Sequence, residues 1–526
     1  MAAGGLPCLE LRRIKLDRKD RSVIFKYTFL SSCLTGFICY LYFIANNLDN
    51  YDSIINKPSG YGSGISSGRW FLSVLGIIFD KIWHYNSSSF NCILAIILLG
   101  FINVLLVCIF KIKNKCICIL LSAITIVFPP IADTMFFAFT IHYYMIAILL
   151  GLAGVYFIQN INRVNSIFIK IFLIILSGTL YACSLGIYQA YYPFIAVVLI
   201  LSLIINCLEK EEDWRRVLEK AVYYFASLLS GYVIYRIILK LCLYILKKEL
   251  TDYKGINNMG YIDLKQFPKL LYNTYSSYMM LFKENFISIN ANILAKLIIF
   301  LIFLCVLFLV FFAYRNCDKL KFMELCIFIA ILPLASNSII IMVPDSDIRT
   351  MMSLGTISVF YLPLIFLEKG NLGKTSITEN LSGRIFVFVF ILAILNYIWL
   401  SNVNYNALYY ANKKTENYFE RLYCRIESVE GYNENMSVIF VGKTITDAAY
   451  SENWTGMQYY GGNYVSKEQI NLYSRNKFIL NYLGRDYLDI TEEQYEQYKA
   501  EIDQMDKYPN DKSIKVIDGN VFVKLE

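Results

Sequence analysis

Two aspartates stand close together directly after the first long apolar run of the chain. Residues 46–52 read Asn-Asn-Leu-Asp-Asn-Tyr-Asp, which places Asp49 and Asp52 near the outer end of a predicted membrane helix. A carboxylate at the membrane surface can deprotonate the hydroxyl of a glycosyl acceptor, and transfer with inversion needs one such base opposite the leaving group. The alternative is that these acidic residues only keep a helix end in water. Asp49 and Asp52 are therefore the candidate catalytic residues.

Four basic residues are candidates for holding the phosphate of a lipid-linked donor. Arg69 precedes an amphipathic segment, and Arg349 lies in a short predicted outer loop. A planar guanidinium forms paired hydrogen bonds with phosphate oxygens, although Arg69 could equally contact lipid headgroups. Arg236 and Lys240 lie one turn apart inside a predicted span, where an ionisable side chain is costly and indicates function. These two could instead snorkel to the interface.

Six further residues are candidates for contacting the sugar or the acceptor, because they are polar or aromatic and fall in predicted outer loops or at helix ends. For three of them, the histidine, the tyrosine and the glutamine, packing or hydrogen bonding within the fold is the alternative. The two aspartates among them share the loop of Arg349. The six residues are Trp70, His142, Tyr188, Gln189, Asp345 and Asp347.

Other chemistries have no support in the sequence. It contains no phosphate-binding glycine loop, no dinucleotide fingerprint and no nucleophile elbow. The chain has only two histidines, so a zinc site is not expected. No cofactor is predicted, and the need for a divalent cation is left open.

The composition places these residues in a membrane protein. Hydrophobic residues make up 57% of the chain and charged residues 17%, against about 25% charged in soluble domains. We expect an α-helical polytopic membrane protein with about eleven spans, since a span needs about 20 apolar residues. The apolar runs cover residues 23–45, 89–110, 116–130, 136–158, 166–185, 189–206, 221–246, 292–314, 322–342, 351–367 and 385–400.

The distribution of Lys and Arg predicts the orientation of these spans. Basic residues fill the segment before the first run and then every second connection, whereas the loops 131–135 and 186–188 contain none. By the positive-inside rule, residues 1–22 are cytoplasmic and the C-terminus is extracytoplasmic. The membrane domain then covers residues 23–403. Its large external loops are 46–88 and 247–291, with amphipathic helices expected at 70–83 and around 269–280.

The tail over residues 404–526 changes in composition and predicts a small extracytoplasmic α/β domain. Residues 405–427 have the pattern of a charged amphipathic helix, and 437–441 that of a strand. Residues 513–517 and 521–525 flank an Asp518-Gly519 pair, which is typical of a β-hairpin turn.

Several short motifs occur in a recognisable order: Ser67-Gly68-Arg69-Trp70, Phe128-Pro129, Gly186-Ile187-Tyr188-Gln189-Ala190, and a closing segment from Tyr508-Pro509 to Asp518-Gly519. In this order and spacing, the chain after Asp20 resembles the bacterial membrane glucosyltransferases of the Gtr type II family. Members of that family modify O-antigen and related surface polysaccharides, and are similar in layout to the multispanning type C glycosyltransferases.

The resemblance implies a polyprenyl-phosphate sugar donor, with glucose as the expected sugar, and a glycan acceptor outside the bacterial cell membrane. Asp49 and Asp52 match the acidic first-loop position of the family. Adjacent acidic pairs are common there, whereas here the pair is separated, so which residue is the base stays open and Asp52 is favoured. Arg69 and Arg349 would steady the donor phosphate, and Tyr188 with Gln189 would touch donor or acceptor.

Three alternatives compete with a transferase. A flippase or sugar transporter would show inverted repeats and broken helices meeting at mid-membrane, and neither is evident in the sequence. A polysaccharide polymerase is less firmly excluded, although a folded tail does not favour it. A non-catalytic scaffold would leave the charged loops without a purpose. A nucleic-acid partner is not expected, because the net charge of +8 is spread between apolar runs rather than gathered in one patch.

Overall fold

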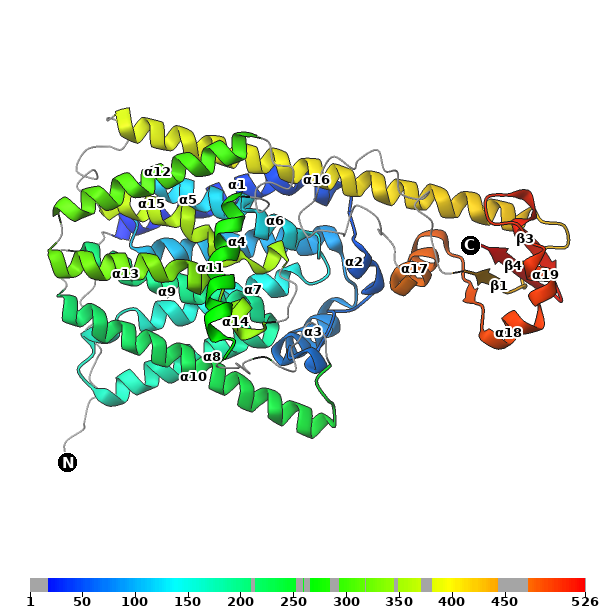
Figure 1. Cartoon of the computed structure of the whole chain (residues 1–526), viewed down its shortest axis with the longest axis horizontal. Helices are drawn as coiled ribbons and strands as arrows, with labels where there is room; N and C mark the ends of the chain where they lie inside the picture. Colours follow the sequence, from blue (N-terminus) through cyan, green and yellow to red (C-terminus); the bar gives the residue numbers. More distant parts are fainter. Residues whose placement is uncertain are drawn as a thin grey trace.

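The computed structural model describes residues 18–209, 213–251, 259, 265–283, 293–316, 318–344, 349–369, 381–442 and 472–525. The candidates Asp345 and Asp347 lie outside these residues. The described chain is a bundle of long helices joined to a small domain with a mixed sheet, as the sequence predicts (Figure 1).

The described residues of the apolar runs are mainly helical. Eight of the described helices are long and apolar enough to cross a membrane, or nine if the bent pair α5 and α6 is one span. This number is below the eleven spans expected from the sequence because two of the expected spans do not qualify. Helix α13 contains three charged residues, Lys319, Lys321 and Glu324, and α15 has only 12 residues. The bundle contains α1 (Arg18–Ala45), α4 (Ser88–Phe110), α5 (Lys115–Val127), α6 (Pro129–Met135), α7 (Ile141–Ile158), α8 (Ile167–Ile187), α9 (Tyr192–Leu208), α10 (Trp214–Leu246), α12 (Ile293–Asn316), α13 (Lys319–Ser336), α15 (Ser358–Lys369) and α16 (Leu381–Glu427).

The third predicted span is broken at a pair of prolines. Phe128 is extended, as expected before a proline, and α6 starts at Pro129 with a bend of 48° from α5. Residues 131–135, expected as an outer loop, are thus helical and fully enclosed in the protein. This short helix brings Asp133 inside the bundle.

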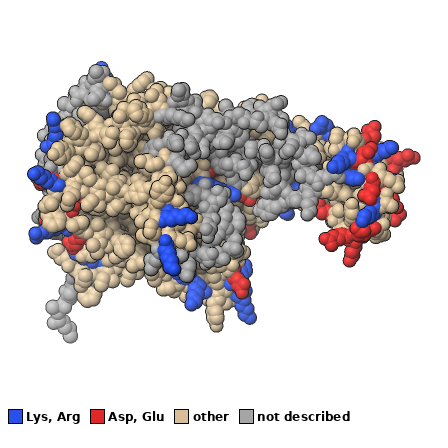
Figure 2. Space-filling model, in the orientation of Figure 1, with Lys and Arg blue, Asp and Glu red and all other residues tan. Residues whose placement is uncertain are grey.

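The two ends of the bundle differ. At one end, which we call the site end, lie the short helices α2 (Tyr51–Ile55) and α3 (Trp70–Trp83), and the sheet domain follows beyond them (Figure 1). At the opposite end, Glu209 forms ion pairs with Lys111 at 3.0 Å and Lys369 at 3.5 Å. Figure 2 shows mostly uncharged atoms over the described part of the bundle, with charged side chains at its opposite end, on the sheet domain and at the lower edge of the view, and a few Lys and Arg side chains near its centre. This distribution is typical of helices that face lipid.

Short elements at the site end are fixed by local signals. The Asn50 side chain caps α2 by accepting the Ser53 N–H at 2.8 Å. At Gly68, φ is 76°, a left-handed conformation that favours glycine and that ends the 3₁₀ turn Ile65–Ser67 just before Arg69. The amphipathic segment at 70–83 is α3, and the segment expected around 269–280 is α11 (Phe267–Lys283).

The C-terminal domain contains a four-stranded sheet in the order β2-β1-β4-β3. Strand β1 (Val438–Val441) is parallel to β2 (Leu488–Asp489) and β4 (Asn520–Lys524), and β3 (Ile514–Ile517) is antiparallel to β4. Asp518 and Gly519 both have positive φ, as a tight hairpin turn requires. The helices of this domain are α17 (Leu472–Phe478), α18 (Glu492–Gln497) and α19 (Lys499–Asp503).

Helix α16 runs through the predicted boundary at residue 403. It is continuous over 47 residues, so the helix expected at 405–427 is the extension of the last membrane helix. Its end packs against the sheet through Phe419, Leu422 and Ile426, which share an apolar cluster with Phe440 and Val521. The long helix thereby carries the sheet domain beyond the site end (Figure 1).

Candidate active site

A cavity of about 420 Å³ opens at the site end of the bundle. Its walls come from the first loop, the start of α7, the turn between α8 and α9, and the segments around α14 (Ile339–Met342) and the 3₁₀ turn η5 (Thr350–Met352). Five of the residues selected from the sequence line it together: Asp52, Arg69, Tyr188, Gln189 and Arg349.

Arg69 is held by two tyrosines. Its guanidinium carbon lies 5.0 Å from the centre of the Tyr188 ring, and its Nη1 donates to the Tyr144 hydroxyl at 3.4 Å. The rings of Tyr144 and Tyr188 stack on each other with centroids 4.5 Å apart. A cation above an aromatic face is attracted by the ring, so this stack orients Arg69 toward the cavity.

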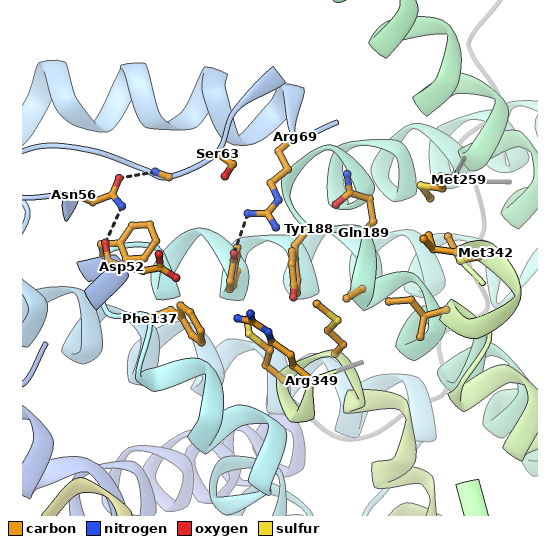
Figure 3. Close-up of a pocket in the computed structure, with 18 of the residues that line it drawn as sticks. Asp52, Asn56, Ser63, Arg69, Phe137, Tyr188, Gln189, Met259, Met342 and Arg349 are labelled. Atoms are coloured by element: carbon orange, nitrogen blue, oxygen red, sulfur yellow. Dashed lines mark hydrogen bonds between the residues drawn. The ribbon is translucent and has the colours of Figure 1, made fainter. Parts of the chain in front are cut away.

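Arg349 approaches from the other side of the cavity. Figure 3 shows the side chains of Arg69 and Arg349 pointing toward each other, with Tyr188 beside them. Arg349 precedes η5, and the buried carboxylate of Asp133 accepts the Met351 N–H at 2.9 Å. Arg349 also acts electrostatically on Asp133. Asp133 therefore fixes the turn from which Arg349 extends.

Gln189 binds the loop before Arg69 by hydrogen bonds. Its Nε2 donates to the Ser67 carbonyl oxygen at 3.1 Å and to the Tyr235 hydroxyl at 3.1 Å. The Tyr235 hydroxyl in turn donates to the Gly68 carbonyl oxygen at 3.0 Å. Gln189 and Tyr235 together bind the carbonyl oxygens of Ser67 and Gly68, the two residues that precede Arg69.

Asp52 lies on α2 at one end of the cavity, near Asn56 and Phe137 (Figure 3). The Asn56 side chain donates to the Asp52 carbonyl oxygen at 2.8 Å and accepts the Gly62 N–H at 3.0 Å. These bonds connect α2 to the loop that follows it. The half-buried Asp52 carboxylate belongs to the cavity wall.

Asp49 has a different environment from Asp52. It is fully buried, and its carboxylate accepts hydrogen bonds from Lys57, Ser88 and, at 2.7 Å, the Tyr482 hydroxyl. It is not among the residues that line the cavity. These contacts favour a structural role for Asp49, and leave Asp52 as the aspartate that faces the cavity.

The other end of the cavity is apolar. It is lined by Met259, Ile339, Met342 and Val343, and Figure 3 places Met259 and Met342 on the far side of the two arginines from Asp52. Arg236 donates to the carbonyl oxygen of Met259 at 2.9 Å, so its side chain contacts the backbone of a residue in the cavity wall.

The remaining candidates do not line the cavity. Trp70 packs against the last turn of α8, where a Cβ on Gly186 would lie 2.7 Å from the indole. The His142 ring is buried against Phe79 and Tyr143. The side chains of Arg236 and Lys240 are exposed on α10, which is compatible with their snorkelling alternative.

Three residues of this site were not selected from the sequence. Asp133 falls in the expected outer loop 131–135, and an acidic residue just after two prolines is a signal of a broken helix. Tyr144 follows His142 at a predicted helix start, and Asn56 follows Asp52 by one helical turn, so spacing alone could have suggested both. In the described part of the chain, no three His, Cys, Asp or Glu side chains gather closely enough to hold a metal ion.

Comparison with known proteins identifies the family. The family model described as Glucosyl transferase GtrII matches residues 41–360, which is more than half of the chain and includes every described residue of the cavity wall. No curated protein sequence matches the chain significantly. The chain therefore belongs to the GtrII glucosyl transferase family, and membership of this family implies a multispanning membrane enzyme that transfers glucose.

Proposed function

We propose that this enzyme transfers glucose, with inversion, from a polyprenyl-phosphate donor to a cell-surface polysaccharide or a lipid-linked glycan. The observation that carries the proposal is the order of groups along one cavity. Asp52 lies at one end, Arg69 and Arg349 face each other between the ends, and apolar side chains line the other end (Figure 3).

Each part of the cavity suits one part of such a donor. The two guanidinium groups balance the charge of a phosphate and fit its oxygens in pairs. The apolar end, with Met259, Met342 and Val343, suits the first isoprene units. The sugar then occupies the end with Asp52, where Phe137 and Phe139 offer aromatic faces for stacking.

The chemistry follows from this placement. Asp52 takes the proton of an acceptor hydroxyl as its oxygen forms a bond to the anomeric carbon. The bond between the anomeric carbon and the phosphate oxygen breaks, and polyprenyl phosphate leaves with the electron pair. Arg69 and Arg349 stabilise the negative charge that develops on the leaving phosphate. One base opposite the leaving group gives inversion.

The reaction then takes place on the extracytoplasmic face of the bacterial cell membrane. Basic residues at the opposite end of the bundle, including Lys111, Lys321 and Lys369, support a cytoplasmic position for that end. A donor with its phosphate between the arginines would keep its polyprenyl chain in the bilayer, and its sugar would meet water and the acceptor.

The test is transfer of labelled glucose from polyprenyl-phosphate glucose by the purified protein in lipid nanodiscs, with a native acceptor extract. Asp52→Asn should lower transfer by about 10³-fold or more, since it keeps the shape but removes the base. Asp80→Asn, at an exposed position on α3, is the matched control and should transfer normally.

Two results would contradict the proposal. Normal transfer by Asp52→Asn would remove Asp52 as the base. A folded wild-type protein that transfers no sugar, but moves the lipid-linked donor between leaflets or joins glycan repeat units, would instead support the flippase or the polymerase.

A further inference from the structure

Helix α2 lies between the cavity and the C-terminal domain. Asp52, Ile55 and Asn56 line the cavity, whereas Ile54 is buried in the apolar cluster that the C-terminal domain forms with the end of α16. With only five residues, α2 cannot be stable by itself, so its position depends on tertiary contacts.

One of these contacts is made by Tyr482 of the C-terminal domain on the residue just before the cap of α2. Its hydroxyl donates to the Asp49 carboxylate at 2.7 Å. Asp49 precedes α2 and also binds Lys57, which follows α2, so one carboxylate connects both ends of the helix. The side chain of Asn412 on α16 donates to the Asp49 carbonyl oxygen at 3.3 Å.

Tyr482 is itself anchored to the long helix α16. Its ring stacks on Phe478, with centroids 4.7 Å apart, and Phe478 packs against Phe419 of α16 at 5.8 Å. A series of direct contacts therefore runs from α16 through Phe478 and Tyr482 to Asp49, which lies three residues before Asp52.

We propose that Tyr482 is a positioning residue for Asp52, so that docking of the C-terminal domain on α2 sets the geometry of the base. This inference rests on the proposed role of Asp52. It gives the C-terminal domain, all of which follows the part matched by the family model, a defined task in the reaction.

The bond is suited to a permanent contact. Burial of the hydroxyl and the neighbouring Asp49 carboxylate raise the pKa of Tyr482 well above its ordinary value. The phenol thus stays protonated and remains a donor at every pH at which the enzyme would be assayed. The contact is therefore controlled by docking of the domain and not by protonation.

The kinetic test compares Tyr482→Phe with Tyr423→Phe in nanodiscs. Tyr423 is the matched control, because its hydroxyl donates to the Asp486 carbonyl oxygen at 3.0 Å within the same domain and makes no bond to α2. Tyr482→Phe should lower kcat about 10-fold, since a small misplacement of a reacting group is costly, with the donor KM unchanged. Tyr423→Phe should keep the wild-type kcat.

Hydrogen exchange of the amides of α2 provides a second readout that does not depend on activity. Tyr482→Phe should speed exchange at Ser53 and Ile54, and Tyr423→Phe should not. Unchanged exchange in Tyr482→Phe, or equal acceleration in both variants, would overturn the inference. A wild type that transfers no glucose would contradict the proposed function alone, because the coupling is still read from the exchange rates.

Discussion

The guanidinium of Arg69 lies over the ring of Tyr188, 5.0 Å from its centre, and the two residues come from distant parts of the sequence. Arg69 directly follows Gly68, which ends the 3₁₀ turn Ile65–Ser67. Tyr188 lies in the turn between α8 and α9. Because the ring and the Tyr144 hydroxyl set the plane of the guanidinium in advance, a phosphate would meet an already oriented fork.

Replacement of Arg69 by lysine should therefore impair donor binding even though the charge is kept. Lysine cannot form the planar paired contact or stack in the same way on Tyr188. We expect the donor KM of Arg69→Lys to rise about 10-fold, measured by initial rates over a range of donor concentrations. Arg216→Lys, at an exposed position near the start of α10, is the control and should leave KM within about twofold. An unchanged KM in Arg69→Lys would place the phosphate elsewhere.

Substitution of the two aspartates of the first loop, Asp49 and Asp52, should affect thermal stability differently. Asp49 is fully buried and pairs with Lys57, which is mostly buried, and loss of one charge of a buried pair typically costs about 3–5 kcal/mol. Asp49→Asn should accordingly lower the thermal midpoint of unfolding in detergent, whereas Asp52→Asn should not. Wild-type unfolding of Asp49→Asn would show that the pair with Lys57 does not stabilise the fold.

Gln189 and Tyr235 should act as one unit. Both hold the turn before Arg69, and each is a hydrogen-bond partner of the other. We expect Gln189→Leu and Tyr235→Phe each to lower kcat/KM, and the double variant to be little worse than the worse single one. Fully additive losses in this double-mutant cycle would show that the two residues support Arg69 independently.

Much of the fold could be predicted from the sequence, because its signals are local. Apolar length marked the helices, the amphipathic period marked 70–83, and the Asp518-Gly519 turn marked the hairpin. The number of spans was less predictable, since the prolines after Phe128 bend one helix by 48°, and α13 includes three charged residues. Such breaks are set by a few residues within otherwise apolar runs.

The site was predictable only in part, for a related reason. Asp52, Arg69 and Arg349 carry charges in predicted loops, so residue type alone selected them, and their roles remain predictions. Trp70 and His142 have residue types common in binding sites, yet tertiary packing buries them away from the cavity. The contact of Tyr482 with Asp49 spans 433 residues and follows from the docking of a domain, which no local pattern encodes.

Substitution of Asp133 tests whether this residue fixes the turn from which Arg349 extends. Its carboxylate accepts the buried Met351 N–H, and alanine would leave that donor without a partner at a cost of about 1–3 kcal/mol. Asp133→Asn keeps an oxygen acceptor and should be more stable than Asp133→Ala. It nevertheless removes the ionisable carboxyl group that interacts with Arg349, so the donor KM should still rise several-fold.

The pair of variants separates support of the turn from orientation of Arg349, when thermal unfolding and initial rates are measured on the same nanodisc samples. Thr140→Ala, which removes a buried hydroxyl outside the cavity wall, is the control for a general effect of polar truncation in this region. If Asp133→Asn matched the wild type in both stability and KM, Asp133 would serve only as an acceptor for Met351. The orientation of Arg349 would then not depend on the carboxyl group of Asp133.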